Sequence, residues 1–189
     1  MVRLMHSIVP AVGAVGALAI AFAVPPILNA VVPQRETDIA AGTLIALTAT
    51  GIGAVHGGTD PANGVTFQVP EPMRRVATGD ESIVVLRSTD GAQRLSVSVS
   101  DGITDFATAA PRLLLPLRAA GVTVRYDGGQ VAAGEFQGLS CVLPDSAGGV
   151  CAVAQSGDVA VMITATGTTA QDGNSLIAAV LSSAKAVES

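Results

Sequence analysis

The feature that most constrains this chain is an apolar run near its N-terminus, which extends from Ser7 to Val32 without a charged side chain. Because a helix rises about 1.5 Å per residue, about 20 apolar residues cross the hydrocarbon core of a membrane. Arg3 precedes the run, and basic residues favour the cytoplasmic side of a membrane. We therefore expect residues 1–6 to be a short cytoplasmic tail and residues 7–32 to be a single transmembrane helix, with the main domain outside the cytoplasm.

A cleaved signal peptide is the alternative interpretation of the same run. It has a basic residue, an apolar core and the small-residue pattern Ala21-Phe22-Ala23, which is typical of a cleavage site. Pro25 follows this pattern closely and the apolar residues continue to Val32, which favours a permanent anchor. Both interpretations place the domain outside the cytoplasm, bound to the cell membrane in the first case and secreted in the second.

The charge and the aromatic content argue against whole classes of partner. The chain has 15 acidic residues, 10 lysines and arginines, a net charge of −5, and 3% aromatic residues with no tryptophan. Nucleic-acid-binding domains carry a basic surface and often stack bases on aromatic side chains. We therefore expect no nucleic acid partner, and the expected partners are the membrane, envelope membrane proteins and lipid.

The two cysteines, Cys141 and Cys151, lie in neighbouring strand-like segments on either side of a turn-rich stretch. If the hairpin pairs Leu143 with Gly149, the cysteines face each other across the two strands, at a distance that a disulfide can bridge. An even number of cysteines in an exported domain favours such a bond. A redox pair and a zinc site are the rivals, but the C-x-x-C motif is absent and too few zinc ligands are present. We therefore expect a structural disulfide and no metal.

Alternation of apolar and polar residues predicts an antiparallel sheet in the main domain. Residues 93–100 predict a strand that buries Leu95, Val97 and Val99 and exposes Ser96, Ser98 and Ser100. Asp90-Gly91 is a strong hairpin signal between this strand and residues 82–87. Further strands are expected at 43–48, 65–70, 122–126, 134–142, 150–155 and 159–164, with turns at 127–129 and 157–158 and a solvated turn at Arg74-Arg75.

Two segments predict helices that cover this sheet. Asp105 can cap the first, which ends before Gly121. This segment contains Pro111 and Pro116, so it kinks or splits. Asp172 can cap the second, in which apolar residues recur at helical spacing: Leu176, Ile177, Val180, Leu181 and Ala184. The expected fold is therefore α+β, with an antiparallel sheet covered by two helices over residues 42–189, behind a tether at residues 33–41 and one transmembrane helix.

Three short pieces of sequence carry a resemblance to a known family. They are Ala41-Gly42-Thr43 at the start of a strand, the phrase Val65-Thr66-Phe67-Gln68-Val69-Pro70-Glu71-Pro72, and three C-terminal strands closed by a helix. Over residues 40–187 the pattern resembles the PsbP-like α/β sandwiches, in particular the LpqN-type domains of actinobacterial envelopes. That family usually has glycine and tryptophan where this chain has Pro72 and Met73. The resemblance implies a non-catalytic interaction or accessory module, and it carries over no catalytic residue.

Few residues of this chain could perform acid–base chemistry. The histidines are His6, before the apolar run, and His56, in a glycine-rich loop. A hydrolase would depend on His56, but no G-x-S-x-G motif accompanies it. The glycines at residues 51–58 are followed by neither the lysine of a P-loop nor the rest of a dinucleotide-binding motif. We therefore expect no catalytic residue and no cofactor.

The function that these observations favour is a non-catalytic interaction or accessory module of the cell envelope, anchored at the membrane. A carrier or binder of lipid or of a small hydrophobic ligand is the first alternative, since 49% of the residues are hydrophobic and the domain is expected to be exported. A cleaved, secreted protein is the second alternative. A hydrolase that uses His56 is the last hypothesis.

Overall fold

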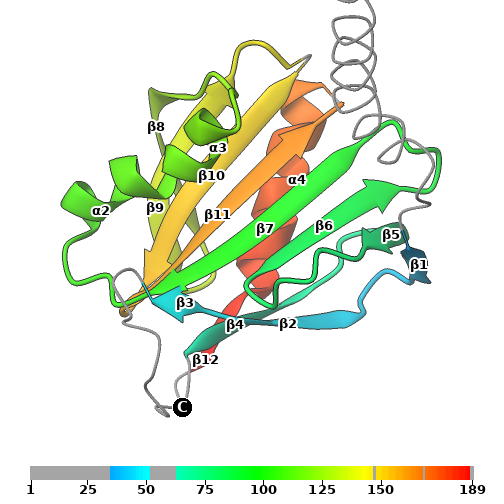
Figure 1. Ribbon diagram of the computed structural model, residues 1–189, viewed down its shortest axis with the longest axis horizontal. Helices are drawn as coiled ribbons and strands as arrows, with labels where there is room; N and C mark the ends of the chain where they lie inside the picture. Colours follow the sequence, from blue (N-terminus) through cyan, green and yellow to red (C-terminus); the bar gives the residue numbers. More distant parts are fainter. Residues whose placement is uncertain (1–34, 52–62, 147, 168, 188–189) are drawn as a thin grey trace, which may run out of the picture. The chain divides into compact units, whose positions relative to one another are not determined.

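Two β-sheets of unequal size form the part of the chain that the computed structural model describes, residues 35–51, 63–146, 148–167 and 169–187. Except for Arg35, these residues belong to one unit, Glu36–Ser189. The larger sheet has the order β1 (Glu36–Ile39), β5 (Met73–Val76), β6 (Ile83–Ser88), β7 (Arg94–Asp101), β11 (Val159–Thr166), β10 (Gly149–Ser156), β9 (Phe136–Leu143) and β8 (Arg125–Ala133). A short strand, β3 (Thr50–Gly51), pairs with β7 in parallel. The smaller sheet has the order β12 (Lys185–Val187), β4 (Gly64–Gln68) and β2 (Leu44–Thr48) (Figure 1).

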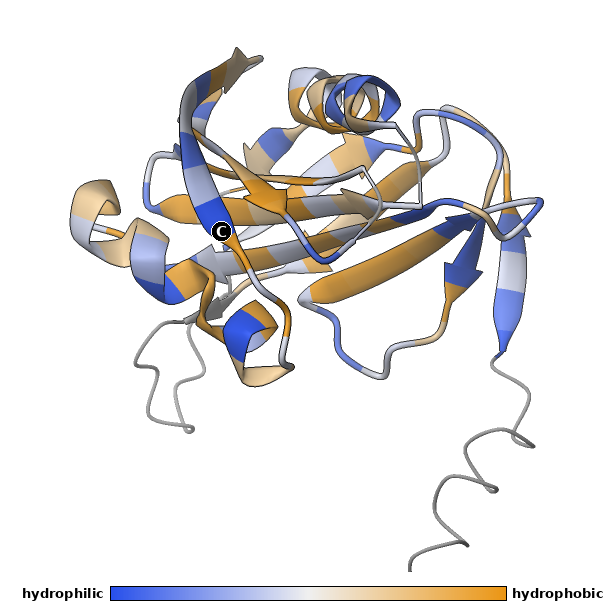
Figure 2. Ribbon diagram, turned by 90° about the horizontal axis from the view of Figure 1, so that it is seen from above, coloured by the Kyte–Doolittle hydropathy of each residue, from blue (hydrophilic) through white to orange (hydrophobic). Residues whose placement is uncertain are grey.

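Helices lie on both faces of the larger sheet (Figure 1). The helix α4 (Ala170–Ser183) contacts β10, β11 and β4 and, together with the smaller sheet, encloses the main hydrophobic core. The helices α2 (Phe106–Leu113) and α3 (Leu115–Ala119) lie on the opposite face, over a second and smaller core. Figure 2 shows that apolar residues are concentrated in the strands that lie between the helices of the two faces.

Strand β7 shows how the alternation in the sequence separates the two faces. Its apolar residues are buried in the main core, and its serines face the side that carries α2 and α3. These residues are Leu95, Val97 and Val99 on the first face, and Ser96, Ser98 and Ser100 on the second. The predicted strand and its hairpin with β6 are therefore confirmed.

Strand β11 lies in the middle of the larger sheet although it comes late in the chain. It pairs with β10 on one side and with β7 on the other, so that Val161 lies opposite both Ala154 and Val99. On the β7 side follow β6, β5 and β1, and on the β10 side follow β9 and β8. In the larger sheet, β11 therefore joins two groups of strands that do not otherwise pair.

The expected architecture, one antiparallel sheet covered by two helices behind a transmembrane helix, is wrong. The structure has two sheets, one of which includes the parallel pair β3–β7, and its helices lie on opposite faces of the larger sheet. The helix expected from Asp105 is split at Leu114, because Pro116 has no N–H with which to continue it. No helix in the described ranges is long and apolar enough to cross a membrane. Residues 7–32 lie outside those ranges.

Two segments that we expected to be irregular form strands at one edge of the larger sheet. Residues 36–39, part of the expected tether, form β1, and Arg74, expected in a turn, lies in β5. The guanidinium of Arg74 lies 3.8 Å from Glu36 and 3.4 Å from Asp38, and that of Arg87 in β6 lies 3.2 Å from Glu36. These ion pairs link three strands, and none of the pairing is visible in the local sequence pattern.

The turn that we expected at residues 127–129 is instead an irregularity within β8. The register between β8 and β9 shifts there, and β8 continues beyond it to Ala133. A carboxylate oxygen of Asp127 accepts hydrogen bonds from the amide of Gly129 at 2.9 Å and from the hydroxyl of Ser140 in β9 at 2.5 Å. The Asp127 side chain therefore stabilises a bulge where we expected the strand to end.

The C-terminal helix is confirmed, but its capping residue differs from the expected one. Thr169 is the N-cap of α4, and its hydroxyl oxygen accepts a hydrogen bond from the amide of Asp172 at 3.2 Å. Asp172, which we expected to cap the helix, lies in its first turn. A negative charge there interacts favourably with the helix dipole and stabilises the helix. Most of the predicted apolar positions are buried in the main core: Ile177, Val180, Leu181 and Ala184.

Candidate functional site

A groove of about 520 Å³ runs between the α2–α3 pair and the strands β6, β7 and β11. Its floor consists of alternate residues from two strands, and its wall comes from α3 and the end of α2. The floor includes Ser96, Ser98, Ser100, Ala160 and Met162, and the wall includes Leu113, Leu115, Pro116 and Leu117. The groove therefore combines an apolar wall with a floor that carries hydroxyl groups.

The groove exists because α2 and α3 cover only part of their face of the larger sheet. Ala110, Leu113 and Leu114 pack in the second core with residues of β9 and β10, among them Val153. After α3 the chain turns at Gly121, whose φ is +79°, a backbone conformation that glycine adopts readily. The chain then enters β8 at the far edge of the sheet, so these short helices leave the part above β6 and β7 open.

Leu115 is the most exposed apolar residue of the wall. It has 54% of its surface exposed, and Leu44 and Val187 are the other large hydrophobic residues that are exposed in the described part of the chain. Single exposed apolar residues are common on proteins. An exposed leucine at the edge of a groove, beside Pro116 and Leu117, forms a continuous apolar surface that water solvates poorly.

Three serine hydroxyls of β7 face this groove without a hydrogen-bond partner in the described residues. Ser98 lies opposite Ile83 of β6 and Met162 of β11 in the register of the sheet, and Ser96 and Ser100 lie two residues to either side of it. Each hydroxyl can donate one hydrogen bond and accept others. Because alternate residues of a strand are about 6.8 Å apart, the three hydroxyls form a row along the floor.

Two charged residues line the groove, and they differ in their partners. The carboxylate of Asp80 accepts hydrogen bonds from the amide and the hydroxyl of Ser82, at 2.8 and 2.7 Å. Arg112 has no carboxylate within 4.0 Å among the residues that the structure describes. The arginine is therefore the charged group of the groove that is free to bind a ligand.

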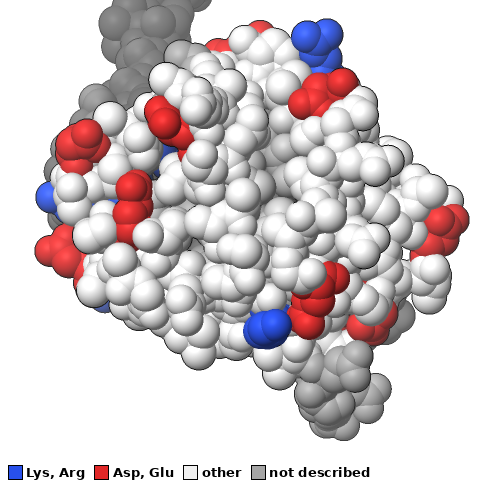
Figure 3. Space-filling model, turned by 180° about the vertical axis from the view of Figure 1, so that it is seen from behind, with Lys and Arg blue, Asp and Glu red and all other residues white. Residues whose placement is uncertain are grey.

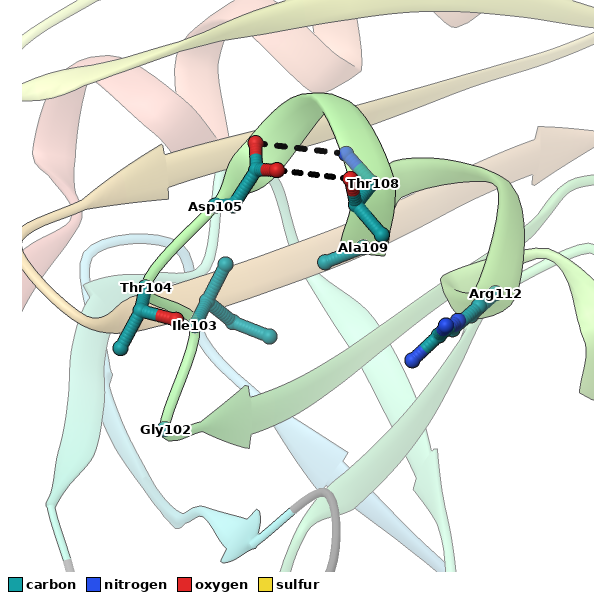
Figure 4. Close-up of a pocket in the computed structure, with 7 residues that line it drawn as sticks. All are labelled: Gly102, Ile103, Thr104, Asp105, Thr108, Ala109 and Arg112. Atoms are coloured by element: carbon teal, nitrogen blue, oxygen red, sulfur yellow. Dashed lines mark hydrogen bonds between the residues drawn. The ribbon is translucent and has the colours of Figure 1, made fainter.

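Arg112 also lines a smaller hollow of about 190 Å³, between α2 and the residues that precede it (Figure 4). Figure 4 shows its side chain pointing toward Ile103, across the hollow from Asp105. Asp105 is the confirmed N-cap: its carboxylate accepts hydrogen bonds from the amides of Ala107 and Thr108 at 3.1 and 3.4 Å, and from the Thr108 hydroxyl at 2.6 Å. The Thr108 hydroxyl, and then its amide, lower the pKa of Asp105 below its ordinary value. This helix N-terminus is thus already occupied by the carboxylate of the protein.

A third cavity of about 350 Å³ lies between α4 and the strands β8, β9 and β10. Ser140, Asn174 and Gln130 contribute polar groups to it, and small residues such as Ala152 form its floor. The hydrogen bonds from Ser140 and then Gly129 lower the pKa of the Asp127 carboxyl.

The side of the molecule that carries α4 is mostly uncharged, with isolated acidic and basic side chains and no broad patch of either sign (Figure 3).

The cysteine pair lies where its spacing predicts. Cys141 is directly opposite Cys151 in the β9–β10 ladder, and Leu143 is opposite Gly149, as the predicted register requires. The Cα atoms are 4.8 Å apart, the sulfur atoms are at disulfide-bonding distance, and each residue is 1% exposed. The pair belongs to the second core, beneath α2 and α3, so it contributes to the layer that forms the wall of the groove.

Tyr126 packs beside this pair and carries a buried polar group. It lies opposite Cys141 in the β8–β9 ladder. Its hydroxyl is buried and has no hydrogen-bond partner in the described part of the chain. Burial raises the pKa of Tyr126, and the positive charge of Arg118 opposes that change in pKa.

Most of the other residues that sequence reasoning considered lie outside the part of the chain that the structure describes. His6, His56 and the glycines at residues 52–58 lie outside the described ranges, and within those ranges no three His, Cys, Asp or Glu side chains are grouped as metal ligands. Sequence reasoning missed the groove. The available signal was the row of outward serines on β7, followed along the chain by a proline-split helix with three consecutive leucines, Leu113–Leu115.

Neither a family model nor a curated protein sequence matches this chain. The resemblance to PsbP-like envelope domains therefore stays an expectation from the residues that carry it.

Proposed function

We propose that this chain is a non-catalytic binding module whose groove takes up the apolar part of a small hydrophobic ligand or lipid. The observation that carries the proposal is the apolar wall, formed by the exposed Leu115 and Pro116 and the half-buried Leu117, that faces a groove of about 520 Å³. Ligand pockets typically have volumes of about 300–1,000 Å³ and are mostly apolar, with a few polar groups that orient the ligand. The serine row and Arg112 are polar groups of this kind.

The exposed leucine supplies a reason for a ligand to bind. Burying a whole leucine side chain contributes about 1.5–3 kcal/mol. Since Leu115 is 54% exposed, covering what remains exposed would contribute about half of that range. This contribution to the binding free energy is modest alone. A ligand that fills the groove would also cover Pro116, Leu117 and Met162, which adds to it.

We place this binding role outside the cytoplasm. Buried cysteines at bonding distance support an oxidising compartment, where disulfides form and persist, and the apolar N-terminal run supports export. An accessory role in the cell envelope, with membrane proteins as partners, stays a prediction from the sequence, as does secretion of the cleaved domain. Both are compatible with ligand binding at the groove.

The test of the proposal is a titration of the full-length protein with a neutral fluorescent naphthylamine probe. Leu115→Ser removes the apolar edge of the groove, and Leu44→Ser is the matched control, because Leu44 is 63% exposed and lies on β2 of the smaller sheet. We expect Leu115→Ser to weaken probe binding several-fold and Leu44→Ser to leave it unchanged. Equal binding by all three proteins would contradict the proposed site. Native mass spectrometry of the purified protein would identify a ligand that is retained.

A further inference from the structure

We propose that the ligand of this groove is an amphiphile with a single anionic headgroup, and that Arg112 binds this headgroup. The inference rests on the proposed function, because it assigns the polar end of a ligand whose apolar part occupies the same groove. Arg112 is the one lysine or arginine, among the described residues, that lines either the groove or the adjoining hollow. Because Arg112 is the residue that the two linings share, it contributes a positive charge to both cavities.

The charge of Arg112 is available, unlike that of other arginines on the same face of the larger sheet. Arg74 and Arg87 contact Glu36, and Arg74 also contacts Asp38. A guanidinium offers five N–H donors and binds a carboxylate or a phosphate through two parallel hydrogen bonds. Because no carboxylate of the described chain takes this place beside Arg112, an anion of the ligand can.

The two carboxylates that line these cavities with Arg112, Asp80 in the groove and Asp105 in the hollow, limit the charge of the headgroup. Both oxygens of Asp105 accept hydrogen bonds from the first turn of α2, and Asp80 accepts two from Ser82. These local hydrogen bonds hold each carboxylate against residues two or three positions away in the sequence. Their negative charges still act over several ångströms, so a singly charged headgroup is favoured over a dianion.

The floor of the groove is suited to a chain that extends away from this headgroup. Ser96 and Ser100 are four residues apart in β7, which corresponds to about 14 Å. A linear alkyl chain of medium length spans such a distance, and its apolar surface would contact Leu115 and Met162. The serine hydroxyls can donate hydrogen bonds to ester or headgroup oxygens.

The experiment compares ligands that share a chain and differ in the headgroup. Decanoate, a decyl methyl phosphate and decanol each displace the neutral probe from the full-length protein, from Arg112→Gln and from Arg118→Gln. Arg118→Gln is the matched control, since it removes the same charge from α3, and Arg118 does not line the groove. Thermal unfolding curves verify that both variants fold.

We expect the wild-type protein to bind the two anions about tenfold more tightly than decanol, because hydrogen bonds to charged groups are the stronger kind. Arg112→Gln should remove this preference, Arg118→Gln should keep it, and added salt should reduce it. The tighter of the two anions identifies the headgroup as a carboxylate or a phosphodiester.

Three results would overturn the inference in different ways. If decanol binds as tightly as the anions, and Leu115→Ser weakens all of them, the headgroup assignment fails and the apolar groove stands. If no ligand displaces the probe, and Leu115→Ser leaves the affinity for the probe unchanged, the proposed function fails as well. An equal loss of preference in Arg118→Gln would show a general charge effect in place of a site at Arg112.

Discussion

Reduction of the bond between Cys141 and Cys151 should destabilise the domain by an amount that the loop length sets. The cysteines are 10 positions apart in the chain. For a loop of this length, the entropy that a disulfide removes from the unfolded chain corresponds to about 2.7 kcal/mol at room temperature. For a domain of this size, each kcal/mol shifts Tm by about 2–4 °C. We therefore expect reduction to lower Tm by about 5–11 °C.

The assay is thermal unfolding of the full-length protein, followed by circular dichroism with and without reductant. The variant with both Cys141→Ala and Cys151→Ala is the control, because reductant should leave its Tm unchanged. Both cysteines are buried, so the redox state is verified by intact mass, which rises by two hydrogens when the bond is reduced. A fully reduced wild-type protein with the Tm of the oxidised protein would refute the reasoning.

Three further perturbations test separate parts of the fold. The single tyrosine, Tyr126, should form tyrosinate with a pKa above its ordinary value of about 10, measured by ultraviolet absorbance, whereas the denatured protein should titrate near that value. Because the raised pKa favours the neutral phenol in the folded state, the free energy of unfolding should be unaffected below pH 10 and should fall as the pH rises through the native pKa. Tyr126→Phe should remove that fall. A variant whose stability falls with pH as the wild type's does would contradict this assignment to Tyr126. Thr169→Ala removes the N-cap of α4 and should lower the unfolding free energy by about 1 kcal/mol in urea titrations; no change would mean that the cap hydrogen bond is unimportant. In Gly138→Ala, the added Cβ would clash with the carbonyl oxygen of Val153 in the neighbouring strand, so we expect a loss of about 3 kcal/mol of unfolding free energy. A variant as stable as the wild type would show that β9 and β10 can move apart there.

The sequence predicts those parts of the fold in which a local pattern is enough. The alternation in β7 predicts which side chains are buried, since only one register places Leu95 and its apolar neighbours in the core. The spacing of Cys141 and Cys151 around a short turn likewise predicts the β9–β10 register. In both cases the strand partners are close along the chain, so turn chemistry and periodicity determine the pairing.

The sequence does not predict strand pairing where the partner strand is distant along the chain, or where a side-chain hydrogen bond lets a strand continue past an expected turn. Strands β1 and β5 depend on each other and on the ion pairs between Glu36 and two arginines. Each strand has four residues, and β1 is mostly polar while β5 carries two adjacent arginines. The bulge at residues 127–129 depends on Ser140, which is on the next strand. The groove depends on how far the α2–α3 pair reaches across the sheet, and Pro116 predicts the break in the helix but not that reach.

The central position of β11 has a consequence for how this chain matures. Strands β5 to β7 and strands β8 to β10 can each form as consecutive hairpins while the chain is still being synthesised. The larger sheet closes only when Val159–Thr166 has emerged, and the smaller sheet closes later still, when Lys185–Val187 pairs with β4. Because contacts of high sequence separation form slowly, we expect the core to be completed only after these late strands have paired with β7 and β4. We therefore expect the hairpins of β5 to β7 and of β8 to β10 to form before the sheet that joins them.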